Sequence, residues 1–480
     1  MIDRNIWLGG AAVFVAALSL PTLAGAQTAL TGATLVDGNG RVVEDSVIIV
    51  DKDRIACAGA KAECRVPKGA KVTSLSGKYV TPGLIDAHVH FDQTGWLDGR
   101  PDALLVPDIY SYPDVITATR ADSGRWHRAF LCAGVTAVYD VGGAPWTVQD
   151  SHATDTDRAD RAHVRSAGPL VTHMLFNGPG LELSPDQQNF FSMKSDAEAM
   201  ESVRRIKAMG STSLKVWFID PKPEERDAMV GRLMLVGREA KALGMDLIVH
   251  ATEVDNAKEA LRAGATYLVH NVDDKFVDDE FIALMKKNDA TLSPTIVVVP
   301  GWSKAMMSVA TGWKMPVDDP GKCVSQTMMD RINNPAILTP AYDAKFTRQQ
   351  TFARAFRSAK WEVMGMLNLK TLVDAGVKIA TGTDAGNPLT MHGPSIYAEM
   401  EAMQDAGMTP MQVIESTTVR GAEVMRMSDT IGTLEKGKIA DLLVLGEDPR
   451  KDVKAFRSLT HVMRKGVLKT QEELQVRKGD

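Results

Sequence analysis

The chain has 480 residues, of which 44% are hydrophobic and 24% are charged, and its formal net charge is −5. This length is too great for one small core and favours a large enzyme domain with a smaller domain beside it. The negative net charge and the absence of Lys/Arg-rich runs argue against nucleic-acid binding.

The first 26 residues are typical of a secretory signal peptide. An early cation, Arg4, is followed by an apolar stretch that is short for a membrane span, then by Pro21 and by small residues that end at Ala26. We expect cleavage after Ala26, before Gln27, and a periplasmic or secreted mature protein with no stable membrane span. The alternative is an uncleaved N-terminal anchor.

Two kinds of pattern divide the rest of the chain. Residues 27–80 and 431–480 alternate β-branched residues with turn signals, and we expect them to form one composite β-sandwich domain. Residues 81–430 repeat strand, loop and helix around eight β-rich runs, which predicts an α/β fold with a (β/α)8 TIM barrel. Residues 301–345, rich in Met, Pro and Asn, are the least regular and are expected to form a lid or a long loop.

The four cysteines carry limited information. Cys57 and Cys64 are close enough to close a small loop in an oxidising compartment, but the sequence leaves this disulfide open. Cys132 lies in the apolar run AFLCAGVTAV and is interpreted as a buried small hydrophobe. Without paired CxxC spacing, a structural zinc site is not expected.

Metal-ligand residue types gather at the predicted strand ends, where barrel active sites lie. The stretch GLIDAHVHFD ends in His88 and His90, which point to the same side because strand side chains alternate. Three later strands end at His250, His270 and Asp384. Imidazole and carboxylate are good ligands for divalent metals, so the sequence predicts a metal site at this rim.

Lys215 lies among apolar residues in the fourth predicted strand. A buried ammonium is unfavourable, and two interpretations stay open. A neutral amine beside metal ions reacts with carbon dioxide to give a carbamate whose two oxygens bridge two ions. Alternatively, Lys215 pairs with an acid such as Asp140.

Several stretches resemble the amidohydrolase superfamily, and most closely its imidazolonepropionase-like branch, which includes secreted Xaa-Pro and related dipeptidases. They are YVTPGLIDAHVHFD, AGVTAVYDVGG, SLKVWF, LIVHAT, YLVHNVDD, IATGTDAG and IGTLEKGKIADLLVLGEDP, and the resemblance covers nearly the whole mature chain. The chain departs from this pattern near the rim, where Tyr139 stands in place of the Arg of many relatives and Asn271 in place of their Gly, so the resemblance does not specify the substrate.

The resemblance implies two divalent metal ions, usually zinc. His88, His90 and Asp384 would hold the more buried ion, His250 and His270 the outer ion, and carboxylated Lys215 would bridge the two. Imidazolonepropionases proper use one metal and lack the bridging lysine, so Lys215 favours the dipeptidase-like type.

We therefore expect an exported binuclear amidohydrolase that cleaves a C–N bond of a dipeptide or N-acyl amino acid with a metal-bridging hydroxide. Asp384 would take the proton of the attacking water and pass it to the leaving nitrogen. Alternatives are a lactone, a carbamate or urea, a xenobiotic amide, or a non-catalytic scaffold. A cationic residue at the pocket floor would favour a free carboxylate, and an apolar pocket would favour esters or xenobiotics. Large barrels of this kind commonly self-associate, so a homo-oligomer is expected.

Three further residues are candidates for substrate binding: His392 on the loop after strand eight, His173 after strand three, and Tyr139 near the rim. The remaining histidines have polar or helical contexts and are expected at the surface: His127, His152, His163 and His461.

Overall fold

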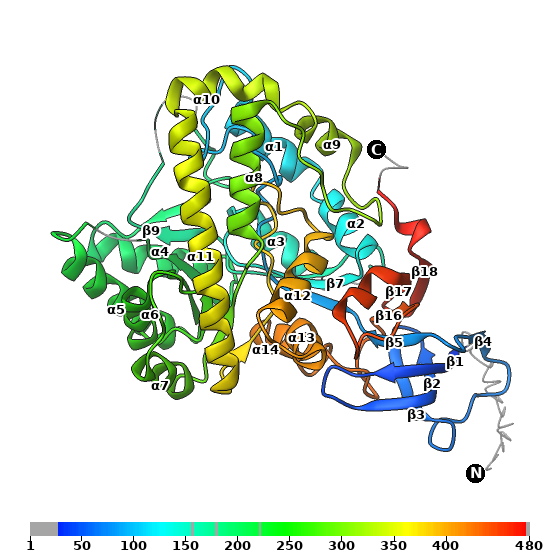
Figure 1. Ribbon diagram of the computed structural model, residues 1–480. Coiled ribbons are helices and arrows are strands. Elements are labelled where there is room, and N and C mark those ends of the chain that lie inside the picture. The colour runs from blue at the N-terminus through cyan, green and yellow to red at the C-terminus, as the bar shows by residue number, and fades with distance from the viewer. Residues whose placement is uncertain (1–26, 155–157, 177, 179–180, 220–221, 477–480) are drawn as a thin grey trace, which may run out of the picture.

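The computed structural model describes residues 27–154, 158–176, 178, 181–219 and 222–476. A barrel occupies most of the molecule, and a β-sheet built from both ends of the described chain lies against it (Figure 1). The predicted signal peptide and its cleavage site at Ala26 lie outside the described residues. Within the described part of the chain, the helices lack the combination of length and apolar character that crossing a bilayer requires.

Parallel strands form the barrel. In chain order these are β6 (Leu84–Val89), β7 (Val135–Asp140), β8 (His163–Ser166), β9 (Leu170–Thr172), β11 (Ser213–Trp217), β12 (Asp246–His250), β13 (Tyr267–Val269), β14 (Thr291–Ser293) and β15 (Lys378–Ile379). The third predicted strand is split into β8 and β9, which pair with β7 and β11 respectively. The short strand β10 (Phe190–Ser192) extends the sheet beside β9.

The barrel closes between its first and last strands. The chain after β15 runs along β6, with hydrogen bonds from Asp384 N to His88 O (2.7 Å) and from His90 N to Ala385 O (2.9 Å). Gly382 permits this close approach, because a Cβ there would lie 2.6 Å from the Cβ of His88. The parallel strands, in two sheets joined here by these hydrogen bonds, confirm the predicted barrel.

Helices surround the barrel and connect its strands. They are α1 (Tyr112–Ala121), α2 (Gly124–Cys132), α3 (Pro145–Thr154), α4 (Asp196–Ala208), α5 (Arg226–Ala242), α6 (Val254–Arg262), α7 (Asp279–Lys287), α8 (Val298–Thr311), α9 (Gln326–Ile332), α10 (Thr339–Lys345), α11 (Arg348–Asp374), α12 (Ser395–Asp405), α13 (Pro410–Glu415) and α14 (Gly421–Val424). Short 3-10 segments lie at Pro335–Leu338, Val453–Ser458 and Glu472–Leu474, and a π-helical turn lies at Ser416–Arg420.

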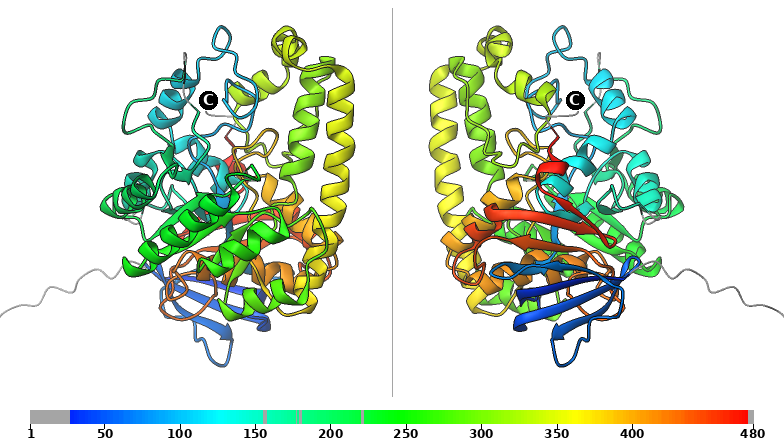
Figure 2. Two further views of the ribbon diagram at one scale, coloured as in Figure 1. Left: turned by 90° about the vertical axis from the view of Figure 1, so that its left-hand side faces the viewer. Right: turned by 90° about the vertical axis from the view of Figure 1, so that its right-hand side faces the viewer.

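The region expected to be irregular is largely helical. Helices α8 and α11 pack side by side and stand upright beside the barrel, with α10 near their upper end (Figure 2). A separate hydrophobic cluster that includes Met306, Val309 and Leu338 supports them. Residues 301–345 therefore belong to a packed helical excursion between β14 and β15, although their composition is rich in Met and Pro.

The composite sheet joins the two ends of the described chain. Its strands are β1 (Thr28–Val36), β2 (Val42–Asp51), β3 (Arg54–Ala60), β4 (Lys71–Ser74), β5 (Tyr79–Pro82), β16 (Leu442–Leu445), β17 (Leu459–Arg464) and β18 (Val467–Thr470). They form one continuous mixed sheet in the order β18-β17-β16-β5-β1-β2-β3, with β4 also paired to β1. The red C-terminal strands lie beside the blue N-terminal strands in Figure 2. The domain boundaries at residues 80 and 430 stay predictions.

The four cysteines form two disulfides. Cys57 bonds to Cys64 within the composite sheet, and Cys132 bonds to Cys323 across 191 residues of sequence. The interpretation of Cys132 as a simple buried hydrophobe is therefore wrong, although its side chain is fully buried. A partner so far away in sequence leaves no local signal.

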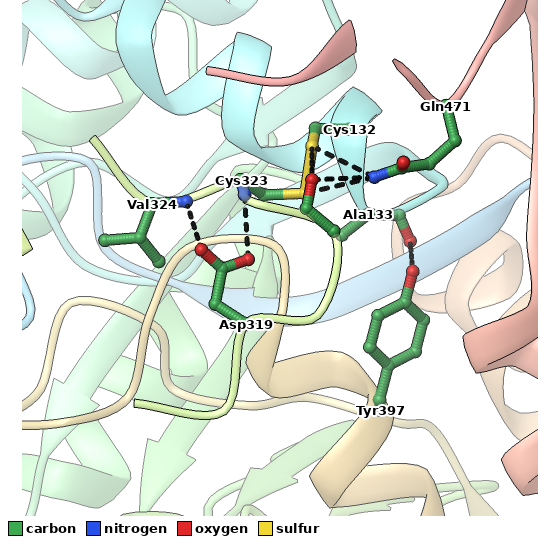
Figure 3. The surroundings of a disulfide bond; sticks show 8 residues. Cys132, Ala133, Asp319, Cys323, Val324, Tyr397 and Gln471 are labelled. Carbon is green, nitrogen blue, oxygen red and sulfur yellow. Dashed lines mark hydrogen bonds between the residues drawn. A yellow bond between two sulfur atoms is a disulfide. The ribbon is translucent and has the colours of Figure 1, made fainter. Parts of the chain in front are cut away.

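The long-range disulfide ties α2 to the segment that follows α8 (Figure 3). The carboxylate of Asp319 accepts hydrogen bonds from the backbone N–H groups of Cys323 (2.7 Å) and Val324 (3.0 Å). The side chain of Gln471, just after β18, donates to the carbonyl of Gly321 at 2.9 Å. The barrel, the helical excursion and the C-terminal strands are thus joined at one place.

Two of the four histidines expected at the surface are buried. His127 packs its ring 5.2 Å from the ring of Phe91, and His163 Nε2 lies 3.1 Å from Asp441 Oδ2 at the contact between barrel and sheet. Aromatic packing and a charged partner explain their burial. His461 is partly exposed on β17, and the side chain of His152 lies outside the described part of the chain.

Candidate metal centre

The predicted metal ligands lie together at the carboxyl ends of the barrel strands. His88 and His90 come from the end of β6, with ring centroids 5.3 Å apart. His250 ends β12, and His270 directly follows β13, with ring centroids 4.2 Å apart. His88 brings the two pairs into contact, since its ring centroid is 5.0 Å from that of His270.

Asp384 is the carboxylate on which the histidines converge. Its Oδ1 lies 2.9 Å from His90 Nε2 and 3.3 Å from His88 Nε2, and its Oδ2 lies 3.9 Å from His270 Nδ1. Among the described residues, both ring nitrogens of His88 and Oδ1 of Asp384 are buried without a hydrogen-bond partner. Buried polar atoms are rarely left unpaired, and a metal ion would satisfy these.

One group of three meets a geometric criterion for binding a cation. Ligand atoms of His88, His270 and Asp384 lie within 4.8 Å of one another. The resemblance had assigned His270 to the outer ion and the other two to the inner ion. The described side chains form one continuous cluster, and their division between an inner and an outer ion stays a prediction.

The backbone is strained where the ligands are held. His270 (φ 76°), Asp384 (φ 59°) and Thr295 (φ 47°) adopt left-handed conformations that non-glycine residues rarely take. Such strain persists only where the surrounding structure enforces it, and it clusters at functional sites. The hydroxyl of Thr295 is hydrogen-bonded to His270 Nδ1 at 2.7 Å, so one strained residue orients another.

Neighbouring groups fix the orientation of the ligands. The carbonyl of Gly142 accepts a hydrogen bond from His90 Nδ1 at 2.5 Å, which directs Nε2 toward Asp384 Oδ1. Asp86 was missed by the sequence reasoning. Its carboxylate accepts hydrogen bonds from Thr383 N (2.9 Å) and Thr383 Oγ1 (2.6 Å). These bonds connect β6, which carries His88, to the segment after β15 that carries Asp384. The place of Asp86 two residues before His88 was the available signal.

Burial dominates the electrostatics of the cluster. It lowers the pKa of Lys215 to about 7 and that of His270 to about 4, and it holds the pKa of His88 and of His250 well below the ordinary value. Burial alone would raise the pKa of Asp384, but His88, His90 and His270 hold it well below its usual range. Burial alone would lower the pKa of His90, but its hydrogen bond with Asp384 and the charge of that carboxylate raise it. Neutral rings of His88, His250 and His270 beside the ionised carboxylate form a donor set suited to a divalent cation.

A cavity of about 250 Å³ opens over the cluster. Its lining includes the five side chains of His90, Lys215, His250, His270 and Asp384. A cavity of this size, with metal ligands at its base, suits a small-molecule substrate.

The three predicted substrate-binding residues are absent from the described lining of this cavity. The His392 ring stacks on Trp126 at 4.0 Å, and its Nε2 donates to the carbonyl of His90 at 2.9 Å. The Tyr139 hydroxyl donates to Ser213 Oγ at 2.6 Å inside the barrel. His173 lies partly buried outside the cavity. The geometry does not support substrate contact by these residues, because packing and local hydrogen bonds direct His392 and Tyr139 elsewhere.

A network that the sequence did not reveal forms one side of the cavity. Arg100 pairs with both oxygens of Asp102 (3.0 and 2.8 Å) and donates to Asn387 Oδ1 at 3.0 Å. Asn387 Oδ1 also accepts from Trp302 Nε1 at 3.1 Å, and Asn387 Nδ2 donates to the carbonyl of Asp384 at 3.2 Å. These residues come from three distant segments, and none lies in a periodic strand or an otherwise recognisable motif.

A scan against protein-family models places residues 79–469 in the amidohydrolase family. The chain belongs to this family. It is 23% identical over 430 residues to imidazolonepropionase of Micrococcus luteus, covering 87% of this chain and 92% of that enzyme. It is 22% identical over 481 residues to ochratoxinase of Aspergillus niger, covering 92% and 86%. A solved Xaa-Pro dipeptidase with methionine bound in its active site shares the fold at a TM-score of 0.66 and 22% identity, covering 93% and 100%.

Family membership and the donor set agree. The protein is a metal-dependent hydrolase acting on carbon–nitrogen bonds, and its buried His and Asp side chains fit a divalent metal. The recognition of the family, the barrel fold and the enzyme class predicted from the sequence are confirmed.

Proposed function

We propose that this amidohydrolase is an exported, binuclear enzyme that cleaves the amide bond of a dipeptide or N-acyl amino acid. The observation that carries the proposal is the position of Lys215, a buried amine among four histidines and Asp384 at the base of the cavity. Single-ion members of the branch lack this lysine, as the sequence resemblance implies.

The surroundings of Lys215 favour the carbamate interpretation over the ion-pair interpretation. Within the described part of the chain, no ion pair or hydrogen bond joins its ammonium nitrogen to Asp140, which acts on it only through its charge. Because burial brings the pKa of Lys215 to about 7, a substantial fraction is neutral near pH 7. A neutral amine attacks carbon dioxide, loses a proton and becomes a carbamate with two oxygens available to two ions.

Asp384 is proposed as the group that moves the proton. The ions, which are zinc by family resemblance, would lower the pKa of a bound water and polarise the substrate carbonyl. The carboxylate of Asp384 is ionised and faces the cavity, so it can accept the proton of the attacking water and deliver it to the leaving nitrogen. The hydrogen bond of Asn387 to the Asp384 carbonyl holds its backbone in place.

A second candidate is the amide or a related bond of a xenobiotic. The similarity to ochratoxinase over most of both chains favours it, because that enzyme's name denotes a toxin as its substrate. The apolar part of the cavity lining, which includes Phe190, Trp217 and Trp302, is compatible with an aromatic group.

Export is supported by the signal-like sequence before Gln27 and by the two disulfides, which persist in oxidising compartments. Expression of the full chain in a bacterial host, followed by fractionation and N-terminal sequencing, tests this. A periplasmic product beginning at Gln27 is expected. An intact N-terminus on a membrane-bound product would establish the anchor instead.

Self-association is also proposed, supported by an apolar stripe on the outer face of α11. Phe352, Phe356, Val363 and Leu367 follow helical spacing and are between 49% and 78% exposed. Light scattering of the purified protein should give a mass above that of the 52.0 kDa chain, and Phe356→Ser should lower it.

The substrate proposal is tested by a hydrolysis screen of zinc-loaded and chelator-treated protein. The panel pairs dipeptides and N-acyl amino acids with lactones and aryl amides. Turnover of a peptide or N-acyl amino acid that is lost with chelation is the expected result. Turnover of only lactones or aryl amides would support the second candidate and reject the dipeptidase assignment.

A further inference from the structure

The cavity lining is rich in carboxyl groups. It contains two basic side chains, Arg100 and Lys215, and six acidic ones. The acidic side chains are Asp92, Asp98, Asp102, Asp273, Glu362 and Asp384. Arg100 is neutralised by its two-point contact with Asp102, and Lys215 lies among the candidate metal ligands. The described lining therefore offers no uncompensated cation to a substrate carboxylate.

Three of these carboxylates have no ion-pair partner among the described residues. Asp92 follows β6, Asp273 follows β13, and Glu362 lies on α11, so they approach the cavity from three separate elements. Asp98, by contrast, is paired with Arg331 at 3.1 Å. Lys304 acts on Glu362 only at a distance, through its charge.

Asp92 is an independent sign that a hydrogen-bond donor belongs here. It is only 2% exposed, and its Oδ2 accepts a hydrogen bond from Asn189 Nδ2 at 3.0 Å. Its Oδ1 has no partner in the described structure. A buried carboxylate oxygen without a donor is unfavourable, and a ligand group that donates a hydrogen bond would relieve this.

Asp273 is crowded by like charges. Burial, together with the neighbouring Asp274 and Glu253, raises the pKa of Asp273 to about 7. A positive group in the cavity would favour its ionised form.

Aromatic side chains complete a surface that suits a cation. Phe190, Trp217 and Trp361 line the cavity, and the rings of Phe190 and Trp217 stack at 5.7 Å. The Trp302 ring is already contacted by Arg100 and Arg354. The other three rings offer negative π faces that attract an ammonium or guanidinium group.

We propose that the cavity selects substrates bearing a positively charged nitrogen, bound by Asp92, Asp273 and Glu362. This inference rests on the proposed function and narrows it to dipeptides with a free α-ammonium group or a basic side chain. N-acyl amino acids are disfavoured relative to dipeptides because they lack the cation that would offset their carboxylate. The lining that would meet such a carboxylate is acidic.

The proposal is tested with pairs of substrates that differ in charge but have nearly the same size. Lysine-containing dipeptides are compared with their norleucine counterparts at each position, and free dipeptides with their N-acetyl forms. We expect kcat/KM to favour the charged member by on the order of tenfold for at least one of these comparisons. Asp273→Asn and Glu362→Gln should each reduce this ratio severalfold. Glu447→Gln, which changes an exposed acid in the composite-sheet region, should not.

Binding is measured separately from turnover. The protein is titrated with L-lysinamide and with L-norleucinamide while tryptophan fluorescence is followed, since Trp217, Trp302 and Trp361 line the cavity. Tighter binding of the lysine derivative, weakened in Asp273→Asn and Glu362→Gln, is expected.

The two readouts separate failure of this inference from failure of the proposed function. Dipeptide turnover without charge preference, or a preference unaffected by both variants, would overturn the inference and leave the function standing. Charge-selective binding without dipeptide turnover would overturn the function and support the acidic cavity. Absence of both would overturn both.

Discussion

The floor and the helical wall of the cavity are built in different ways. The floor consists of His90, Lys215, His250, His270 and Asp384, which line the cavity, together with the fully buried His88, and barrel strands and the segments after them carry these residues. The helical wall consists of α8 and α11, which contribute Trp302, Trp361 and Glu362 from one excursion between β14 and β15. The floor is fixed by the hydrogen-bonded ladders and strained backbone around it, whereas the wall rests on its own hydrophobic cluster.

We infer from this difference that the floor carries out the chemical step and that the wall selects the substrate. Side chains on neighbouring parallel strands keep their spacing because the strands share backbone hydrogen bonds. A helical excursion outside the ladder can change its side chains without moving the ligands. Variants of the floor should therefore affect kcat and metal content, and variants of the wall should affect KM and substrate preference.

The largest effect is expected for Asp384→Asn. The amide can neither accept a proton nor bind metal as a carboxylate does, so kcat should fall by about four orders of magnitude. Steady-state kinetics of the metal-loaded variant measure this, with Asp405→Asn, an exposed acid on α12, as control. A kcat within tenfold of the wild type would remove Asp384 from the proton transfer.

The next largest effect is expected for Lys215→Ala. This variant should have a kcat/KM reduced by about three orders of magnitude and should bind less than the full complement of metal. Elemental analysis of dialysed protein measures the metal, and Lys207→Ala on the exposed side of α4 is the control. Added acetate or propionate should restore part of the activity, because a small carboxylate fills the vacated space and supplies two oxygens. Full metal content with no rescue would argue for the Asp140-paired interpretation.

The floor should also make the metal-free protein sensitive to acid. Burial lowers the pKa of His270 from its ordinary 6.5 to about 4, so between these values the unfolded chain binds a proton that the folded protein does not. Stability should therefore be complete above pH 6.5 and fall as pH drops toward 4, by roughly 3 kcal/mol for this residue.

Urea unfolding of chelated protein across this pH range measures the effect. His88 and His250 change in the same direction, and His270→Asn should therefore flatten the pH dependence in part. Equal slopes for the variant and the wild type would show that His270 is not buried as a neutral ring.

The contrast between floor and wall also explains how much could be predicted. His88, His90, His250 and His270 could be predicted because each lies where a short β-rich run ends, and the barrel brings such ends together. The position of Lys215 in the site could be predicted from the sequence, but its role could not. That its amine has no ion-pair partner among the described residues is visible only in three dimensions.

The wall and the second layer could not be predicted for a physical reason. Trp302 and Glu362 meet the cavity through helix packing, and Arg100 reaches Asn387 across 287 positions of sequence. The Cys132–Cys323 bond depends on the same long-range packing. His392 and Tyr139 were placed at the rim from chain order alone, whereas their contacts with Trp126 and Ser213 decide where their side chains point.

The smallest effect is expected for Trp302→Phe, which tests the wall most directly. The change keeps an aromatic ring beside Arg100 and removes only the indole N–H that donates to Asn387 Oδ1. Asn387 retains its hydrogen bonds to Arg100 and to the Asp384 carbonyl, so the floor should keep its geometry. One neutral hydrogen bond contributes about 1 kcal/mol, and KM should therefore rise about three- to sixfold while kcat changes less than twofold. A large fall in kcat with KM unchanged would mean that the wall positions Asp384 for the chemical step, and the separation of the two regions would not hold.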